Sequence, residues 1–273
     1  MNLFLIKFNL YYYSKMKHYL RILTINLCYE CGKNKSLLIN KWIEILSKLK
    51  GDILFIQEIT SFNLEKLASN LQLKILNINH FEGICVLINP NKLIIVDNNI
   101  IKLKSNIEPI YISGIHLDDI PSLPHHINGI IYKSSEIIPL TKSLNEILKL
   151  CAKRRLPKVK EELKKAKKYN IAIIGGDFNE PSHLDLDNIN TPVSKEFEKN
   201  GFIDTFWYAN KKIKNLGYTW PAGNFYKKDP KQRIDMIYTK NLKILNSSIY
   251  DGEKEDRSKW ISDHKLVITD LEI

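Results

Sequence analysis

The sequence contains little cysteine, which limits the kinds of site it can build. Four of its 273 residues are cysteine. Cys28 and Cys31 have the spacing of half a zinc site, but Cys85 and Cys151 do not form the second pair that a structural zinc needs. No disulfide framework can be inferred from four such positions. The expectation is therefore free thiols in a reducing compartment.

The sequence also lacks a long hydrophobic run, and a membrane-spanning helix needs about 18 or more apolar residues in succession. Residues 1–17 are a poor signal peptide, because Lys7 and Asn9 interrupt their apolar residues and no small-residue cleavage site follows. We expect residues 1–17 to be an N-terminal extension, either disordered or upstream of a native start at Met16. Residues 18–273 are then one domain of a soluble, intracellular protein, which we expect to be a monomer.

No internal repeat or long linker divides the chain, and 44% hydrophobic residues over this length can form a large core. Signals for strands alternate with signals for helices. Residues 37–49 carry apolar side chains at helical spacing, and the apolar run 52–58 follows at once. Further helices are expected over 63–71 and over 158–168, the latter charged and solvated with a narrow inner stripe. The alternation predicts an α/β fold.

The segment 171–181 is the most informative in the chain. Four β-favouring residues run into Gly175 and Gly176, and Asp177 and Asn179 follow. The glycines allow tight turning and close backbone approach. Two positions apart in an extended chain, Asp177 and Asn179 should point the same way. For this segment alone, an ordinary strand-ending turn that uses Asp and Asn is the alternative.

More polar residues stand where apolar strands end or begin, and each would be a poor choice for packing alone. A carboxylate in a strand between apolar neighbours, as at position 235, needs a partner. Taken singly, each of these residues is more simply explained as structural. Together they form a set of hard metal ligands and proton-transfer groups. The set comprises Asn26, Glu58, His116, Asp235, Asp263 and His264.

In this order the residues resemble the motifs of the endonuclease/exonuclease/phosphatase superfamily, whose members have the DNase I-like fold. The resemblance covers the chain from about residue 19 to its end. It implies an α/β (α+β) fold, a four-layer sandwich of two packed mixed β-sheets flanked by helices. It also implies hydrolysis of phosphate esters with Mg²⁺ or Mn²⁺, at a site where strand ends converge. The matching motifs are Asn26, Gln57-Glu58, His116, Gly176-Asp177-x-Asn179, Asp235 and Ser262-Asp263-His264.

The residue types suit that chemistry. Phosphate esters are anionic, so a catalyst must neutralise charge, position the attacking water and protonate the leaving oxygen. Magnesium prefers oxygen ligands and keeps several waters, which suits Glu58 as principal ligand with Asn26 and Asp263 near the ion. Asp177 is placed to orient or deprotonate the water.

The remaining catalytic candidates are hydrogen-bond donors. Asn179 can donate its amide to a phosphoryl oxygen, and His264 can contact the phosphate. The charge of His264 depends on a neighbouring carboxylate, and the resemblance implies that this neighbour is Asp235. For His116 the resemblance implies donation to the phosphate or to the leaving oxygen.

Two loops supply candidates for substrate binding. The loop 117–134 is too rich in proline for a helix or a central strand, so we expect it to rim the site and to offer Asp118 and His126. Ordinary surface polarity is the alternative for both residues. The aromatic loop 217–221 precedes the Asp235 strand and is placed to line a cleft. The candidates from this second region are Tyr218, Trp220 and Arg233.

The run 180–185, Glu-Pro-Ser-His-Leu-Asp, directly follows the Asp177 motif. It departs from the DNA-repair members of the superfamily and looks more like a microbial branch of uncharacterised hydrolases. This departure argues against an abasic-site endonuclease.

The charge favours a polyanionic partner. Lysine and arginine number 41 against 30 acidic residues, giving a net charge of +11. Aromatic residues lie among the lysines of 208–231 and could stack bases, so nucleic acid is the expected substrate. An AT-rich genome, suggested by abundant Ile, Lys and Asn, is an alternative source of the lysine. Small or lipid-derived phosphate esters are the second substrate class. A non-catalytic nucleic-acid-binding protein is disfavoured, because every expected catalytic position is filled.

Overall fold

The structure is a computed structural model. Residues 1–16, which make up most of the expected N-terminal extension, lie outside its described part, as do Cys31 and residues 133–134 of the rim loop. Among the described residues, no helix is both long and apolar enough to cross a bilayer. The described residues are 17–28, 35–79, 83–105, 108–132, 142–211, 217–223, 225–250, 252 and 260–273.

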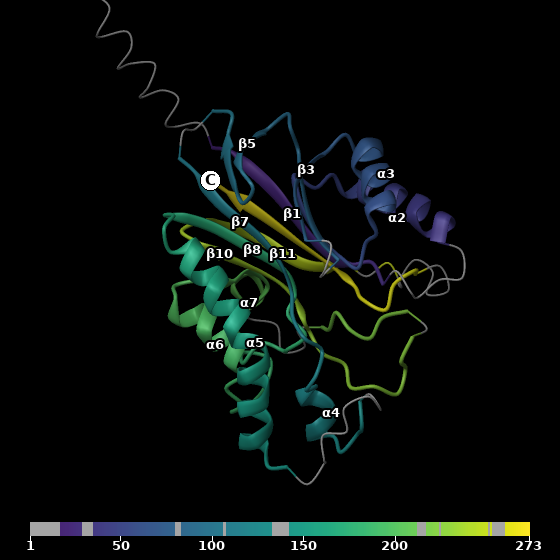
Figure 1. The fold of residues 1–273 in the computed structure, drawn as a ribbon, viewed down its shortest axis with the longest axis vertical. Coiled ribbons are helices and arrows are strands. Elements are labelled where there is room, and N and C mark those ends of the chain that lie inside the picture. The colour runs from purple at the N-terminus through teal and green to yellow at the C-terminus, as the bar shows by residue number, and fades with distance from the viewer. Residues whose placement is uncertain are drawn as a thin grey trace, which may run out of the picture.

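The described strands form two six-stranded mixed sheets (Figure 1). The first sheet contains, in spatial order, β11 (Lys243–Tyr250), β12 (Leu266–Glu272), β1 (Tyr19–Asn26), β2 (Ile53–Gln57), β4 (Ile84–Ile88) and β3 (Lys74–Asn79). The second contains β5 (Leu93–Asp97), β6 (Ile100–Leu103), β7 (Ile110–His116), β8 (Ile171–Asp177), β10 (Asp235–Lys240) and β9 (Ile203–Asp204).

Helices cover the outer faces of both sheets. Figure 1 shows α2 (Lys35–Leu49) and α3 (Ser61–Leu71) on one side, with α5 (Leu144–Ala166) and α6 (Pro192–Lys199) on the opposite side. The helix α7 (Thr205–Asn210) packs on β10 and β11, and the short helix α4 (Leu123–Ile127) contacts α5. The four-layer sandwich expected from the sequence is confirmed.

The two faces of each central strand are buried in different cores. In β2, Ile53 and Phe55 belong to the core between the sheets, whereas Leu54 and Ile56 pack in the core under α2 and α3. This alternation follows from the two-residue period of a strand. Because both faces are covered, all five residues of β2 are buried, and a polar residue at its end is delivered directly to the edge of the sandwich.

The expected helices are present, and each begins earlier in the chain than expected. α3 begins two residues before position 63, and the charged helix extends back to Leu144. Its inner stripe includes Val159, Leu163 and Ala166, as the sequence predicts, and also Arg155.

The expectation of no helix in the loop after His116 is wrong. α4 forms there with Pro124 in its first turn, where a missing backbone N–H leaves no hydrogen bond unmade.

The cysteines differ from the expectation at one position. Cys85 and Cys151 are buried free thiols, and burial raises the pKa of both. Cys28 is disulfide-bonded, so the expectation of free thiols is wrong there.

Gly175 and Gly176 are required by close contacts in the centre of the sandwich. A Cβ on Gly175 would lie 2.4 Å from the ring of Phe55 in the facing sheet. A Cβ on Gly176 would lie 1.9 Å from the carbonyl oxygen of Ile115 in β7, and Gly176 has a φ of 152°. The pair therefore lets β8 approach both the other sheet and its neighbour directly before Asp177.

Gly176→Ala is expected to lower the free energy of unfolding by about 3 kcal/mol or more, because it combines backbone strain with a clash against backbone atoms. Gly201→Ala is the control. Gly201 also has a positive φ, 79°, but a Cβ there meets no atom within 4 Å, so strain alone should cost about 1 kcal/mol. Urea unfolding measures both variants, and equal losses would contradict the close-contact explanation.

Candidate active site

Six strands bring polar residues to one edge of the sandwich. β7 and β8 run parallel with His116 beside Asp177, and β10 runs antiparallel to β8 with Asp235 opposite Asp177. In the facing sheet, parallel β1 and β2 place Asn26 beside Gln57. β12 begins at the same edge, because it runs antiparallel to β1. The register thus gathers the sequence motifs in one place.

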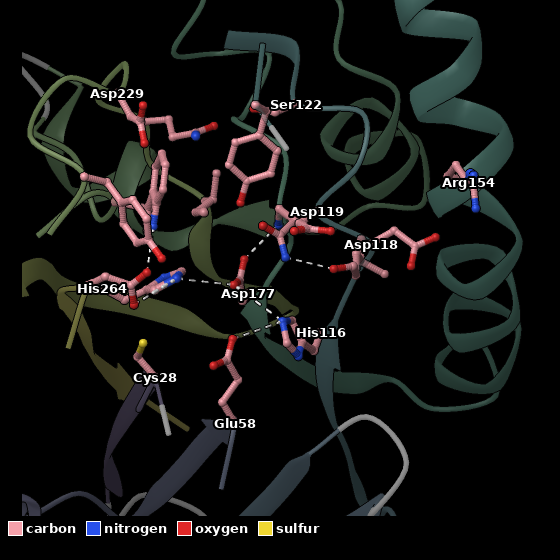
Figure 2. A pocket seen from close by; sticks show the side chains of 18 of the residues that line it. Cys28, Glu58, His116, Asp118, Asp119, Ser122, Arg154, Asp177, Asp229 and His264 are labelled. Carbon is pink, nitrogen blue, oxygen red and sulfur yellow. Dashed lines mark hydrogen bonds and ion pairs between the residues drawn. The ribbon is translucent and has the colours of Figure 1, made fainter. Parts of the chain in front are cut away.

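A histidine from one sheet is hydrogen-bonded to an aspartate of the other. His264, just before β12, shares a hydrogen bond of 2.9 Å between its Nδ1 and Asp235 Oδ2. Its Nε2 lies 3.8 Å from Asp177 Oδ2 (Figure 2). Asp235 is 0% exposed, Asp177 1% and His264 5%. The contact between Asp235 and His264 that the resemblance implied is present, and it turns Nε2 toward Asp177.

The surroundings shift the pKa values of both titratable partners. The pKa of Asp177 is raised to about 6, because burial and the nearby charge of Asp235 raise it more than His264 and His116 lower it. For His264, burial disfavours the cation, but Asp235, Asp263 and Asp177 together raise its pKa well above the usual value. The arrangement therefore combines a carboxyl that can exchange a proton near neutral pH with an imidazole held as a cation.

Asn26 connects the two principal carboxylates. Its Nδ2 donates to Glu58 Oε1 at 2.9 Å and to Asp177 Oδ2 at 3.2 Å. Its Oδ1 accepts from the backbone N–H of Cys28 at 2.9 Å, which fixes the amide orientation. His116 Nε2 lies 3.9 Å from Glu58 Oε1 and 3.8 Å from Asp177 Oδ2, so a cationic His116 would face both carboxylates (Figure 2).

Asn179 does not continue the extended chain. It has a φ of 48°, its N–H donates to Asp177 Oδ1 at 2.8 Å, and its Nδ2 donates to the carbonyl oxygen of Leu117 at 2.8 Å. The expected extended geometry is wrong, because the side chain of Asp177 forms a local turn with the backbone two residues on. Both residues nevertheless line the same cavity.

Asp263 is held in place by an indole. Trp220 Nε1 donates to Asp263 Oδ2 at 3.0 Å. The other oxygen, Oδ1, is buried without a hydrogen bond in the described part of the chain. Next to it, Ser262 Oγ donates to the carbonyl oxygen of Asn26 at 2.7 Å and accepts from the N–H of His264 at 2.9 Å. The turn before β12 is thereby fixed to the end of β1.

Several of these residues line a cavity of about 670 Å³, namely Glu58, His116, Asp177, Asn179, Trp220, Asp263 and His264. Figure 2 shows Glu58, His116, Asp177 and His264 around its inner part, with Arg154 at its margin on α5. Carboxylates outnumber the basic side chains of the lining: Glu58, Asp118, Asp119, Asp177, Asp229 and Asp263, against Arg154, Lys158 and the two histidines His116 and His264.

The donor set fits a hard divalent cation. Asp177, Asp235 and His264 present ligand atoms within 4.8 Å of one another, but the bond between Asp235 and His264 already occupies their facing atoms. Carboxylate oxygens of Glu58 and Asp263 border the cavity, and Asp263 Oδ1 has no hydrogen bond within the described residues. Several carboxylate oxygens in a polar cavity with room for water suit Mg²⁺ or Mn²⁺.

The structure brings only part of the predicted substrate-binding set to the cavity. Asp118 and Trp220 line it. His126, Tyr218 and Arg233 do not belong to its lining. His126 Nε2 is hydrogen-bonded to the carbonyl oxygen of Lys142 at 2.7 Å. The ring of Tyr218 lies under the ammonium groups of Lys231 and Lys265, at 4.5 and 3.9 Å.

Arg233 is a buried structural cation. It is 2% exposed, and its Nη2 lies 2.7 Å from Asp204 Oδ2 and 3.0 Å from Asp185 Oδ1. Two carboxylates surround its guanidinium, so it has no face left for a substrate. It was expected to bind substrate, but Asp204 and Asp185 direct its guanidinium away from the cavity lining.

Sequence reasoning missed several lining residues. Arg154 and Lys158 lie four apart on α5, a spacing that puts them on one helical face. That spacing was available in the sequence, but the helix was expected only over 158–168, so Arg154 was not placed on it. Tyr132, Tyr226 and Asp229 reach the cavity from loops, and no periodic pattern in the sequence identifies them.

Comparison with known proteins adds information on the fold. No family model matches the chain. An uncharacterized protein of Caenorhabditis elegans, F14F9.5, is 28% identical over 188 residues, and the match spans 59% of this chain and 59% of that relative.

Solved structures match over nearly the whole chain. D. rerio TDP2, in a complex with a single-strand DNA product, has a TM-score of 0.64 at 14% identity and covers 93% of this chain and 98% of its own. An endonuclease/exonuclease/phosphatase family protein from Bacteroides thetaiotaomicron has a TM-score of 0.63 at 15% identity, covering 94% and 99%. At these identities the likeness establishes the fold. The chain thus has the DNase I-like fold of the endonuclease/exonuclease/phosphatase proteins, which the order of its motifs predicted.

Proposed function

We propose that the protein is a Mg²⁺- or Mn²⁺-dependent phosphodiesterase that hydrolyses nucleic acid. The observation that carries the proposal is the placement of His264, whose Nε2 Asp235 orients toward Asp177 at 3.8 Å. A cation next to a proton acceptor, in a cavity lined by carboxylates, suits in-line attack of water on a phosphodiester.

Asp177 would act on the attacking water. With a pKa of about 6, its carboxyl is ionised at neutral pH and still basic enough to accept a proton. Asn26 and the N–H of Asn179 each donate to it. These bonds fix its orientation, so little rearrangement is needed when the water is bound.

His264, Asn179 and His116 would stabilise the phosphoryl group. The imidazolium of His264 presents Nε2–H toward the cavity, because its Nδ1 is engaged by Asp235. The Asn179 amide has a second N–H besides the one that holds Leu117. His116, whose side chain is 21% exposed, is the more accessible imidazole and the candidate to protonate the leaving oxygen.

Glu58 and Asp263 are the proposed metal ligands, with Asn26 acting by orienting Glu58 through its amide nitrogen. A bound divalent cation would supply charge neutralisation at the phosphate. Asn26 enters as a donor rather than through its oxygen, because that oxygen accepts from Cys28.

Two observations support a nucleic-acid substrate. The net charge of +11 favours a polyanion, and D. rerio TDP2, which shares the fold, was crystallised with a single-strand DNA product. The second substrate class, small phosphate esters, is favoured by the acidic lining of the cavity and by residues 118–132, several of which close one side of it.

The deciding experiment is cleavage of labelled single- and double-stranded DNA and RNA with Mg²⁺, Mn²⁺ or EDTA. We expect cleavage that requires the metal and stops with EDTA. If the folded protein leaves single- and double-stranded DNA and RNA intact but hydrolyses small phosphate esters, the nuclease assignment is wrong. Small phosphate esters are then the substrate class.

In folded protein, Asp177→Asn and His264→Ala are each expected to lower kcat by about 10³-fold or more, because they remove the proton acceptor and the oriented cation. Glu58→Gln should raise the metal concentration needed for half-maximal activity. Steady-state kinetics with metal titration measure these effects. Asp187→Asn, at an exposed carboxylate outside the cavity lining, is the matched control and should behave as wild type. Full activity in Asp177→Asn would refute the site assignment.

Binding of a catalytically inactive Asp177→Asn protein to an oligonucleotide should weaken steeply with salt, because lysine contacts to phosphates release counterions. Fluorescence anisotropy between about 50 and 200 mM salt should show a loss of roughly tenfold or more for several phosphate contacts. A flat response would point to a small substrate instead.

A further inference from the structure

Arg155 is a buried cation that the proposed chemistry does not use. It lies on the inner face of α5, and its side chain is 0% exposed. All three of its nitrogens are engaged. Nη1 lies 3.3 Å from Glu180 Oε2, Nε donates to the carbonyl oxygen of Asp118 at 2.7 Å, and Nη2 donates to the carbonyl oxygen of Pro121 at 2.7 Å.

The partners of Arg155 belong to the two segments that carry site residues. Asp118 and Pro121 lie in the segment 117–122, which follows His116 and forms one side of the cavity. Glu180 directly follows Asn179. Its second oxygen accepts from the N–H of Val193 at 2.8 Å, so this buried carboxylate is itself fixed on both sides.

The two segments are also bonded to each other. The N–H of Leu117 donates to the carbonyl oxygen of Asp177 at 3.0 Å, and Asn179 Nδ2 donates back to the carbonyl oxygen of Leu117 at 2.8 Å. Lys158, one turn from Arg155, donates to the carbonyl oxygen of His116 at 2.8 Å. Side chains of α5 thus hold three carbonyls of residues 116–121 and, through Glu180, the turn at 177–180.

We propose that Arg155 is a positioning residue, which sets the placement of Asn179 and of the segment 117–122 relative to Asp177. The catalytic part of this inference rests on the proposed function. A planar guanidinium can reach three acceptors in fixed directions, whereas the single nitrogen of lysine cannot span them. A small misplacement of the groups that hold a reacting phosphate lowers the reaction rate. Arg155 therefore affects kcat through the groups it positions, although it does not itself contact the substrate.

Arg155→Lys tests the proposal, because it keeps the charge that pairs with Glu180 and loses carbonyl contacts. We expect kcat for bis(p-nitrophenyl) phosphate with Mn²⁺ to fall by about 10- to 100-fold, with KM changed by less than about threefold. Hydrogen exchange should rise more in residues 117–122 and 178–180 than in the rest of the described chain, which separates local loosening from a global loss of stability.

A double variant covers the case in which Arg155→Lys does not fold. Arg155→Met with Glu180→Met replaces the buried ion pair by apolar side chains of similar size, a change that can leave stability unaffected. It should fold and show the same loss of kcat and the same rise in exchange. A wild-type kcat in either folded variant would overturn the positioning role.

Arg21→Lys is the matched control. Arg21 also combines a carboxylate with a backbone carbonyl, since it contacts Asp270 at 2.7 Å and the carbonyl oxygen of Leu49 at 3.2 Å. It lies toward the opposite end of β1 from Asn26, so its replacement should leave kcat unchanged. If the wild-type protein hydrolyses no phosphate ester, the proposed function fails. Exchange still tests Arg155 in that case, and unchanged exchange in Arg155→Lys would overturn its role.

Discussion

The constraint on which the rest of the structure depends is the burial of two carboxylates on adjacent strands. Asp177 and Asp235 face each other across β8 and β10 and are shielded from water. Without a cation nearby, burying two such charges would lower the free energy of unfolding by several kcal/mol. The cation comes from His264 in the facing sheet. The same bond therefore joins the two sheets at their functional edge and orients the imidazole, so packing and chemistry are not separable there.

The periphery of the site repeats this solution with arginine. Glu180 pairs with Arg155, and Asp185 and Asp204 pair with Arg233. Two of these carboxylates lie in the run 180–185 that follows the Asp177 motif. In that run Glu180 is buried and the side chain of Asp185 is 14% exposed, and both anchor the run to arginines elsewhere in the chain. Since each anchor ends on a different element, the turn that carries Asn179 is fixed from several directions.

The sequence predicted which polar residues stand at the ends of strands. It did not predict the contacts that residues beyond those ends make. Apolar runs that end in Glu58, His116 and Asp177 placed these residues at one edge, because strand polarity and burial follow from pattern. The conformation of Asn179 depends on the hydrogen bond that its N–H donates to Asp177 Oδ1. The alternation of apolar and polar residues in the sequence does not reveal this bond. Arg233 was expected to bind substrate, but its guanidinium is directed by carboxylates that only the tertiary structure brings together.

The net charge of the chain and the charge of the cavity lining have opposite signs. Binding of a polyanion and chemistry at a single phosphate would therefore use different parts of the surface. The protein carries a net charge of +11, yet carboxylates outnumber lysine and arginine in the cavity lining. An acidic cavity attracts a divalent cation and repels an unaccompanied phosphate. Under the proposed function, affinity for a polyanion would come from lysines outside the cavity, while the metal and the histidines would act on the single phosphate that enters it. Binding and turnover would then depend on different surfaces, so a change in one need not alter the other.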